Sequence, residues 1–392
     1  MYKIQTLNKI SNIGIDLFPR DYYEIASEIL NPDAIIVRSA NMLDMSLPTT
    51  VKAVARAGAG VNNIAVDRCS EQGIVVFNTP GANANGVKEL VLTGMLLSSR
   101  KVIPGINWAK GLVGKGDEVP KLIEKGKSDF AGPEIRGKKL GVIGLGAIGV
   151  MVANDAVELG MQVTGYDPFI SVEAAWGLSR NVKRARVLES LIAESDYITL
   201  HTPLNDKTKG MINRERFALM KKGARLLNFA RGGLVNNDDL KEALKDGIVS
   251  YYITDFPDED LLKIDNVISF PHLGASTPEA EDNCAIMAVN QIRAYLEHGN
   301  IKNSVNFPDC ELDSFGQKKR IIVANKNVPN MVGQISTILA NDKINIADMI
   351  NRHKGDFAYN IIDIDGEIPN GIIEKLKLVD GVIMVRQIEN LA

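Results

Sequence analysis

An arginine followed by two glycines ends an apolar segment of this 392-residue chain. In LLNFARGGLVNND (226–238), Arg231 follows residues typical of a buried strand. A guanidinium is costly to bury unpaired, so its partner should be an anion, either from this chain or from a ligand. His272 follows a second apolar segment, NVISFP, and an acidic cluster at 255–260 follows a third. These residue types suit acid–base chemistry on a small anionic molecule.

Six apolar segments, with helical patterns between most of them, position these groups. We predict strands at 139–144, 161–167, 196–201, 224–230, 249–256 and 266–272. This alternation predicts a doubly wound parallel sheet of the Rossmann type. Ligands bind such sheets beyond the carboxyl ends of the strands, where Arg231, His272 and the acidic cluster would converge. Each residue alone is more often structural, but together they predict a site.

A glycine motif follows the first of these strands. Gly144, Gly146 and Gly149 form GxGxxG at the start of a predicted helix. They permit a tight turn, close approach of a pyrophosphate, and close packing of helix on strand. Asp167 ends the second strand, where its carboxylate can accept from ribose hydroxyls and would repel a 2′-phosphate. No arginine follows in DPFI, so the motif predicts NAD rather than NADP.

Other chemical motifs are weaker. KLIEKGKS contains GKS, but Lys121 stands where a P-loop has glycine and no strand precedes it. His201 ends a strand near the expected cofactor and is equally consistent with a packing role. His298 and His353 lie in other parts of the chain, and we expect no metal site.

The rest of the chain has its own α/β patterns. We predict strands at 34–40 and 73–79 in a first domain of residues 1–100, and a helix at 85–102 that reaches the end of this domain. A long helix at 278–298 should return the chain to that domain. Polar residues 303–318 are typical of a linker. The order βαββαβ over 319–392 predicts a ferredoxin-like sandwich.

Composition excludes several classes of function. The net charge of −3 offers no polybasic face, so no nucleic acid or membrane partner is expected. No apolar run reaches membrane-spanning length, and the N-terminus lacks the apolar core of a signal peptide. Three scattered cysteines favour the reducing cytoplasm.

Taken in this order, GLGAIG, NFARGG and PHLGAST resemble the NAD-dependent D-2-hydroxyacid dehydrogenases. VRSA, GAGVNNIAVD and NTPGANANGVKE extend the resemblance toward the N-terminus. It implies an NAD-binding Rossmann domain (101–278) inserted in a flavodoxin-like α/β substrate domain, which 279–302 completes. Among family members, the chain is most similar to those that oxidise 3-phosphoglycerate in serine biosynthesis. Another 2-hydroxy acid (glycerate, lactate or 2-hydroxyglutarate) and a non-catalytic NAD sensor are the alternatives.

The resemblance also implies roles for the polar residues. Arg231 would bind the substrate's carboxylate and C2 oxygen, and His272 would take the hydroxyl proton as hydride leaves C2. A carboxylate would orient His272: the family's F-P-x-E pattern favours Glu259, although Asp260 has the usual spacing from Asp255. Asp255 would then lie on the nicotinamide side.

The same resemblance implies ligand contacts. Arg38 and Ser39 of VRSA would hold the substrate phosphate, near Gly60 and Asn78, with Arg100 as a weaker candidate. The expected cofactor contacts are Gly144, Gly146, Ala147, Ile148, Gly149, Asp167, His201, Thr202, Pro203, Ala230, Arg231, Asp255, His272, Gly274 and Ala275.

The C-terminal unit is similar to ACT regulatory domains. Asn330 stands where their turn usually has glycine, and asparagine tolerates the left-handed backbone that such a turn needs. Asn325, Asn327 and Asn345 match positions that hold an amino-acid effector, here L-serine, across a domain dimer. They are equally consistent with turn-capping asparagines. The family also implies a homodimer or homotetramer.

Overall fold

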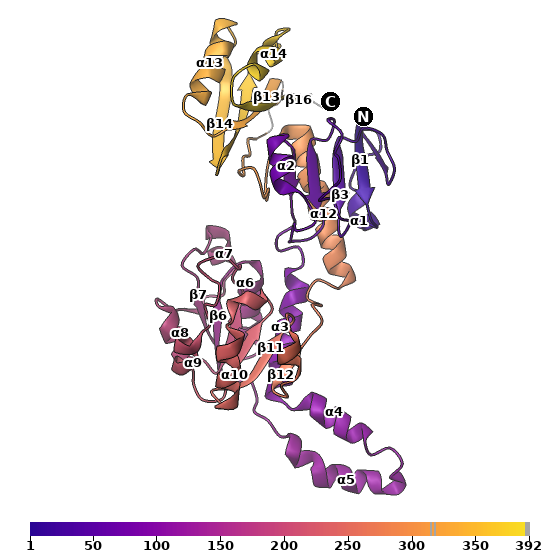
Figure 1. Ribbon diagram of the computed structural model, residues 1–392, viewed down its shortest axis with the longest axis vertical. Helices are drawn as coiled ribbons and strands as arrows, with labels where there is room; N and C mark the ends of the chain where they lie inside the picture. The colour runs from indigo at the N-terminus through magenta and orange to yellow at the C-terminus, as the bar shows by residue number, and fades with distance from the viewer. Residues whose placement is uncertain (314–315, 317–318, 389–392) are drawn as a thin grey trace. The chain divides into compact units, whose positions relative to one another are not determined.

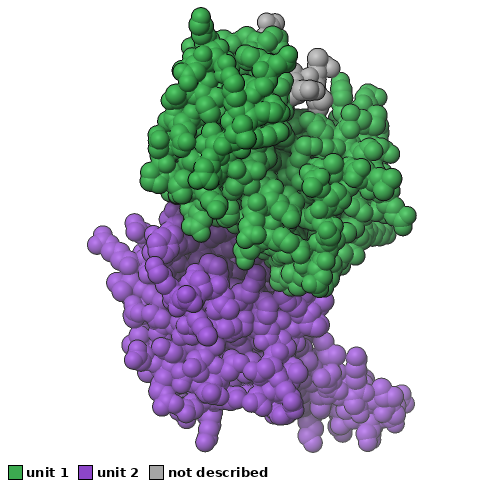
Figure 2. Space-filling view, turned by 45° about the horizontal axis from the view of Figure 1, so that its top comes forward, with its two compact units in different colours: residues 1–83, 278–392 green, residues 84–277 purple. Residues whose placement is uncertain are grey.

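The computed structural model describes residues 1–313, 316 and 319–388 and divides into two compact units (Figures 1 and 2). Unit 1 comprises Met1–Asn83 and Pro278–Ala392, and unit 2 comprises Ala84–Thr277. The predicted fold class is confirmed: two parallel-sheet α/β assemblies accompany a C-terminal antiparallel sheet.

The first sheet of unit 1 has five parallel strands in the order β2-β1-β3-β4-β5, which is flavodoxin-like. Its elements are β1 (Tyr2–Leu7), α1 (Asn12–Ile15), β2 (Tyr23–Ala26), β3 (Ala34–Val37), β4 (Ala53–Arg56), α2 (Val66–Glu71), β5 (Val75–Phe77) and α12 (Pro278–His298). The long helix α12 covers one face through Ala288, Val289 and Ile292. The other face packs on Cys69 of α2. α12 has the bounds that the sequence predicted.

The C-terminal sheet is antiparallel, in the order β14-β15-β13-β16 that a ferredoxin-like sandwich requires. Its elements are β13 (Lys319–Lys326), α13 (Met331–Asn341), β14 (Ile346–Lys354), β15 (Phe357–Ile364), α14 (Ile372–Lys377) and β16 (Val382–Ile388). Helices α13 and α14 cover one face with Ile335, Leu339, Ile372 and Leu376. Asn330 precedes α13 with φ of 67°, so asparagine accommodates the turn as expected.

The opposite face of this sheet belongs to the same apolar core as α12. Tyr359 donates its hydroxyl to the carbonyl of Gly299 at 2.7 Å, just beyond the helix. The guanidinium of Arg386 lies over the Tyr295 ring, 4.4 Å from its centre. The C-terminal sheet is therefore docked within unit 1.

The linker prediction for 303–318 is wrong for its first part. Ser304, Asn306 and Phe307 are buried. The Asn306 side chain accepts from the Val76 amide and donates to the Ile74 carbonyl, so it mimics a strand partner. The polar side chain of Asn306 thus satisfies backbone hydrogen-bonding groups that a neighbouring strand would otherwise satisfy. A polar composition does not show that a segment is buried in this way. Positions 314–315 and 317–318 of that linker, and 389–392 of the C-terminal domain, lie outside the described residues.

Unit 2 contains a seven-stranded parallel sheet in the order β12-β11-β10-β9-β6-β7-β8. Its strands are β6 (Lys139–Ile143), β7 (Gln162–Tyr166), β8 (Lys183–Arg184), β9 (Tyr197–Leu200), β10 (Ala224–Asn228), β11 (Val249–Thr254) and β12 (Val267–Ser269). Its helices include α3 (Ala84–Ser99), α4 (Val102–Lys110), α5 (Val119–Gly126), α6 (Ala147–Glu158), α7 (Val172–Gly177), α8 (Leu188–Glu194), α9 (Arg214–Leu219), α10 (Asn237–Lys245) and α11 (Glu259–Leu262). All six predicted strands are present.

Helix α3 was predicted to belong to the first domain, but it belongs to unit 2. Val87, Val91 and Met95 pack in the core of unit 2, so that unit begins at Ala84 rather than at 101. An amphipathic pattern shows that a helix covers a sheet, but not which sheet. The rejected GKS segment is helical, in agreement with its rejection. No helix within the described parts of the chain is long and apolar enough to cross a membrane.

Candidate functional site

The glycine loop between β6 and α6 is built to receive a phosphate group. Gly144 has φ of 92°, and a Cβ there would lie 2.6 Å from the His201 carbonyl oxygen. A Cβ on Gly149 would lie 2.0 Å from the Gly144 oxygen, so both positions require glycine. A Cβ on Gly146 would meet open space.

The first turn of α6 supplies donors above this loop. Gly146 is its N-cap and no side chain caps the helix. The N–H groups of Ala147, Ile148 and Gly149 therefore have no intrahelical partner and carry the positive end of the helix dipole. These features fit the pyrophosphate of a dinucleotide.

Asp167 follows β7, next to this loop. One carboxylate oxygen accepts from the Leu145 amide at 2.8 Å, and the other accepts from the Phe169 amide at 2.8 Å. Asp167 thus holds the glycine loop against the end of β7. A carboxylate has about four acceptor positions, so two bonds leave capacity for ribose hydroxyls.

His201 follows β9 on the other side of the glycine loop. Its Nε2 lies 2.9 Å from the Thr199 hydroxyl, and its Nδ1 is buried with no hydrogen-bond partner. Desolvation lowers the pKa of His201 to about 3, so the ring is neutral at physiological pH. Next to it, Thr202 donates to the Met211 sulfur and Pro203 accepts from the Thr208 hydroxyl. His201 is therefore a poor proton acceptor.

Arg231 lies in a turn that Asn228 organises. The buried Asn228 side chain accepts from the amides of Ala230 and Arg231 and donates to the Arg231 carbonyl. The Arg231 guanidinium donates to the Ala230 carbonyl at 2.7 Å. Within the described residues it forms no ion pair with a carboxylate. The arginine that ends this strand therefore keeps its charge available to a ligand.

Asp255 and His272 follow β11 and β12; β11 pairs with β10, and β12 pairs with β11 at the edge of the sheet. Asp255 is 4% exposed and its Oδ1 has no hydrogen-bond partner. Burial raises the pKa of Asp255, while the positive charges of His272 and Arg231 oppose that rise. The strand order thus brings an arginine, a buried carboxylate and an imidazole to one edge of the sheet.

The His272 side chain is exposed and positioned by its own backbone and by an aromatic ring. Its φ of 34° is unusual for a residue other than glycine. Its ring packs edge-on against Phe256, with centroids 4.7 Å apart. Gly274 follows it, and a Cβ there would lie 3.8 Å from an Asp255 carboxylate oxygen, so the loop through Ala275 passes next to Asp255.

The structure does not bring Glu259 to His272. Glu259 is the first residue of α11, its side chain is 87% exposed, and it pairs with Lys263 at 3.0 Å. Asp260 pairs with Lys241 at 2.9 Å. Glu259 and Asp260 both lie on the short helix α11, whereas Asp255 is the buried carboxylate that interacts electrostatically with His272.

The predicted phosphate-side residues lie at the carboxyl ends of β3, β4 and β5 in unit 1. Arg38 follows β3, and the Asn78 side chain donates to the Ala59 carbonyl at 2.6 Å. The Ser39 amide donates to the Asn8 side chain at 3.1 Å. Arg100, the weaker candidate, lies in unit 2.

Arg56, which the sequence analysis missed, is a second cation at this edge. It is the last residue of β4 and donates to the carbonyls of Arg38 (3.0 Å) and Gly60. Burial, and then the charge of Arg38, lower the pKa of Arg56. Its position at a strand end was the available signal. Two guanidinium groups at one strand edge suit a doubly charged anion.

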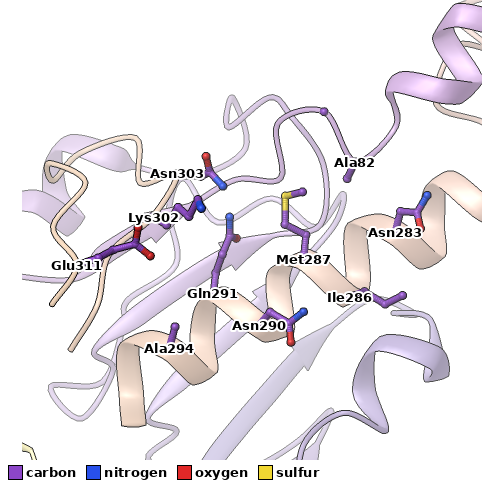
Figure 3. A pocket seen from close by; sticks show the side chains of 11 residues that line it. Ala82, Asn283, Ile286, Met287, Asn290, Gln291, Ala294, Lys302, Asn303 and Glu311 are labelled. Atoms are coloured by element: carbon purple, nitrogen blue, oxygen red, sulfur yellow. The ribbon is translucent and has the colours of Figure 1, made fainter. Parts of the chain in front are cut away.

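Unit 1 also has a cavity of about 610 Å³ beside α12 (Figure 3). Ile286, Met287 and Ala294 form its apolar side, and Lys302 and Glu311 lie at its other end. None of the predicted site residues lines this cavity, but two of its lining residues contact the Asn78 backbone. Gln291 donates to the Asn78 carbonyl at 2.9 Å, and the Asn303 carbonyl accepts from the Asn78 amide at 3.4 Å.

The three predicted effector residues do not meet within one chain. Asn325 lies near the C-terminal end of β13. Asn345 immediately precedes Ile346 of β14, and Ile346 and Lys319 pair with the same residue of β15, Ile364. Asn345 therefore lies next to the N-terminal end of β13, where Lys319 is the first residue. Six residues of strand separate Lys319 from Asn325, which is about 20 Å. One chain therefore cannot use Asn325 and Asn345 in one site.

Their local environments also differ. Asn325 is 1% exposed, donates to the Lys326 carbonyl and accepts from Asn360. Asn327 and Asn345 are exposed and donate to the Gly355 carbonyl and to Asp365, respectively. Asn325 is thus structural, and the other two remain accessible.

Comparison with known proteins defines the class. Residues 95–274 match the NAD binding domain of the D-isomer specific 2-hydroxyacid dehydrogenases. The chain belongs to this family and contains its NAD-binding domain.

Curated relatives of the chain include D-3-phosphoglycerate dehydrogenases. The D-3-phosphoglycerate dehydrogenase of Haemophilus influenzae is 33% identical over 98% of this chain and 93% of its own length. That of Methanocaldococcus jannaschii is 36% identical over 80% of this chain, which spans only 59% of that protein. The NAD⁺-bound 3-phosphoglycerate dehydrogenase of Entamoeba histolytica shares the fold with a TM-score of 0.60 and 26% identity, over 78% of this chain and 98% of that one.

Proposed function

We propose that this protein is a D-3-phosphoglycerate dehydrogenase, which oxidises 3-phospho-D-glycerate to 3-phosphohydroxypyruvate with NAD as the first step of serine biosynthesis. The observation that carries the proposal is the meeting of Arg231, Asp255 and His272 at the ends of three adjacent strands. The relatives support it, because that of Haemophilus influenzae matches nearly the whole chain.

In the proposed reaction, the Arg231 guanidinium binds the substrate's carboxylate through two parallel hydrogen bonds. His272 accepts the proton of the C2 hydroxyl, and the negative charge of Asp255 stabilises the imidazolium that forms. Bound NAD supplies the hydride acceptor. His201 takes no part in proton transfer because its low pKa keeps the ring neutral and weakly basic.

Arg38 and Arg56 would distinguish the phosphorylated acid from its unphosphorylated analogues. Arg38 and Arg56 belong to unit 1, and Arg231 belongs to unit 2. Rates of NADH formation from 3-phosphoglycerate, glycerate, lactate and 2-hydroxyglutarate test the function. Faster turnover of glycerate than of its phosphorylated form would eliminate it, and no turnover of any substrate would favour a sensor.

Replacing Arg38 with alanine should raise the KM for 3-phosphoglycerate by about 10- to 100-fold, because a charged hydrogen bond contributes about 1.5–3 kcal/mol. The Kd for NAD should change less than twofold. Steady-state kinetics and calorimetric NAD titration measure both quantities. Arg20→Ala, an exposed arginine of the same unit, is the control. An unchanged KM would assign the phosphate to other residues.

We further propose that L-serine regulates the enzyme at the C-terminal domain. The 20 Å separation of Asn345 from the Asn325 end of the sheet requires a second copy to complete the site. Asn327 of one chain and Asn345 of the other would bind the two ends of the amino acid. A homodimer or homotetramer is therefore part of the proposal, as is a cytoplasmic location, with which three free buried cysteines agree.

Asn345→Ala should raise the serine concentration for half-inhibition at least about tenfold, because an amide that binds the zwitterion is lost. The rate without serine should stay within twofold. Inhibition curves measure this, with Asn341→Ala, an exposed asparagine at the end of α13, as control. Inhibition like that of the parent would remove Asn345 from the effector site.

A further inference from the structure

The arginine that we assign to the substrate phosphate already has an anionic partner. Arg38 Nη2 lies 2.8 Å from Oε1 of Glu281, in the first turn of α12. Arg231 differs, because its guanidinium has no such partner among the described residues. The carboxylate end of the substrate would thus meet a free cation, and its phosphate end a neutralised one.

This ion pair is not needed to hold the fold. The side chains of Arg38 and Glu281 are 40% and 46% exposed. Exposed pairs of this kind contribute little to stability. The buried pair of the same unit, Arg320 with Asp363, is different: its side chains are 0% and 4% exposed, and Arg320 also donates to main-chain carbonyls.

The charges around the pair favour its exchange for a dianion. Arg56 lies next to Arg38 and has no carboxylate partner of its own among the described residues. Two guanidiniums and one carboxylate leave a net positive charge. A phosphate dianion neutralises both cations and can accept bidentate hydrogen bonds, whereas one carboxylate neutralises only one.

We propose that the Glu281 carboxylate competes with the substrate for Arg38, so that the phosphate of the substrate must displace Glu281 in order to bind. Glu281 then sets the KM for phosphorylated acids and acts as a specificity-determining residue. A ligand without an anionic tail, such as D-glycerate, leaves the pair in place. This inference rests on the proposed function, because it takes Arg38 as the phosphate ligand.

Glu281→Gln tests the proposal, with Glu279→Gln as a matched control. Glu279 is an exposed carboxylate in the same helical turn. Loss of the competitor should lower the KM for 3-phosphoglycerate by about three- to tenfold, with the effect on KM rather than on kcat. The KM for D-glycerate should not change in E281Q, and neither KM should change in E279Q.

A double variant assigns the gain to Arg38. In the Arg38→Ala background, adding E281Q should give no further decrease in KM, because there is no guanidinium left to release. An unchanged or higher KM in E281Q alone would overturn the proposal, since Glu281 would then be neutral or would orient Arg38 for the substrate. The proposal would also be overturned if E281Q lowered the KM for 3-phosphoglycerate in the Arg38→Ala background as much as it does in the parent.

Inorganic phosphate separates this inference from the proposed function. Its Kd, measured by calorimetry on the whole protein, should be lower in E281Q than in the parent and unchanged in E279Q. If neither protein oxidises 3-phosphoglycerate but E281Q still binds phosphate more tightly, the proposed function fails and the competitor stands. If phosphate binds equally to both, the competitor fails whatever the substrate is.

Discussion

His272→Ala should lower kcat by about 10²- to 10⁴-fold, the range that a positioned general base contributes. In the proposed mechanism no other group accepts the C2 hydroxyl proton. His201 cannot replace it, because desolvation lowers the pKa of that ring to about 3. Arg231 and Asp255 do not depend on the imidazole for their positions, since strand ends and backbone bonds place them.

The measurement pairs turnover with cofactor binding. NAD should bind H272A with a Kd within about twofold of the parent, because the glycine loop lies at β6, away from β12 in the strand order. His272→Asn is the second variant, since asparagine tolerates the φ of 34° at this position. His353→Gln, an exposed histidine of β14, is the control. More than a tenth of parental turnover in both His272 variants would remove His272 from proton transfer.

The sequence predicted the elements whose pattern is set by local physics. The strands of unit 2 are runs of apolar and β-branched residues bounded by polar ones, and burial of a parallel sheet on both faces requires such runs. Helix α12 begins at a proline and ends before Gly299, and both are local boundary signals. The glycine motif was recognisable because Gly144 and Gly149 are sterically constrained.

Features that depend on distant contacts were not predictable in the same way. The burial of Asn306 depends on hydrogen bonds to β5, more than 200 residues away in the chain. The assignment of α3 depends on which sheet its apolar face meets. The separation of Asn325 from Asn345 follows from strand register, which a motif does not contain.

The carboxylate that acts on His272 shows the limit of spacing arguments. Counting from Asp255 favoured Asp260, and the F-P-x-E pattern favoured Glu259. Both carboxylates instead belong to or face the short helix α11, where lysines pair with them. The chain leaves β11 at Thr254 and begins α11 at Glu259, and neither spacing argument predicts that short helix.

Asp255→Asn should lower kcat by about 100-fold, or about 2.7 kcal/mol in activation free energy. The buried carboxylate, with its unpartnered Oδ1, stabilises the imidazolium that forms on His272. The acidic limb of the kcat/KM profile should therefore move to lower pH in D255N, a change that a purely structural role would not cause. Glu259→Gln should keep parental kcat, because its side chain is exposed and paired with Lys263. A large loss in E259Q with little loss in D255N would reverse the assignment.

The same variant should be at least as stable as the parent. Because burial raises the pKa of Asp255, the folded protein binds a proton there more readily than the unfolded chain does. The ionised carboxylate thus destabilises the fold at pH values above its raised pKa, and this penalty vanishes as the pH falls below the ordinary value. D255N should therefore show a Tm equal to or above that of the parent at pH 7, and the difference should shrink in acid. A lower Tm at pH 7 would mean that Asp255 stabilises the fold and would weaken the case that its charge is kept for catalysis.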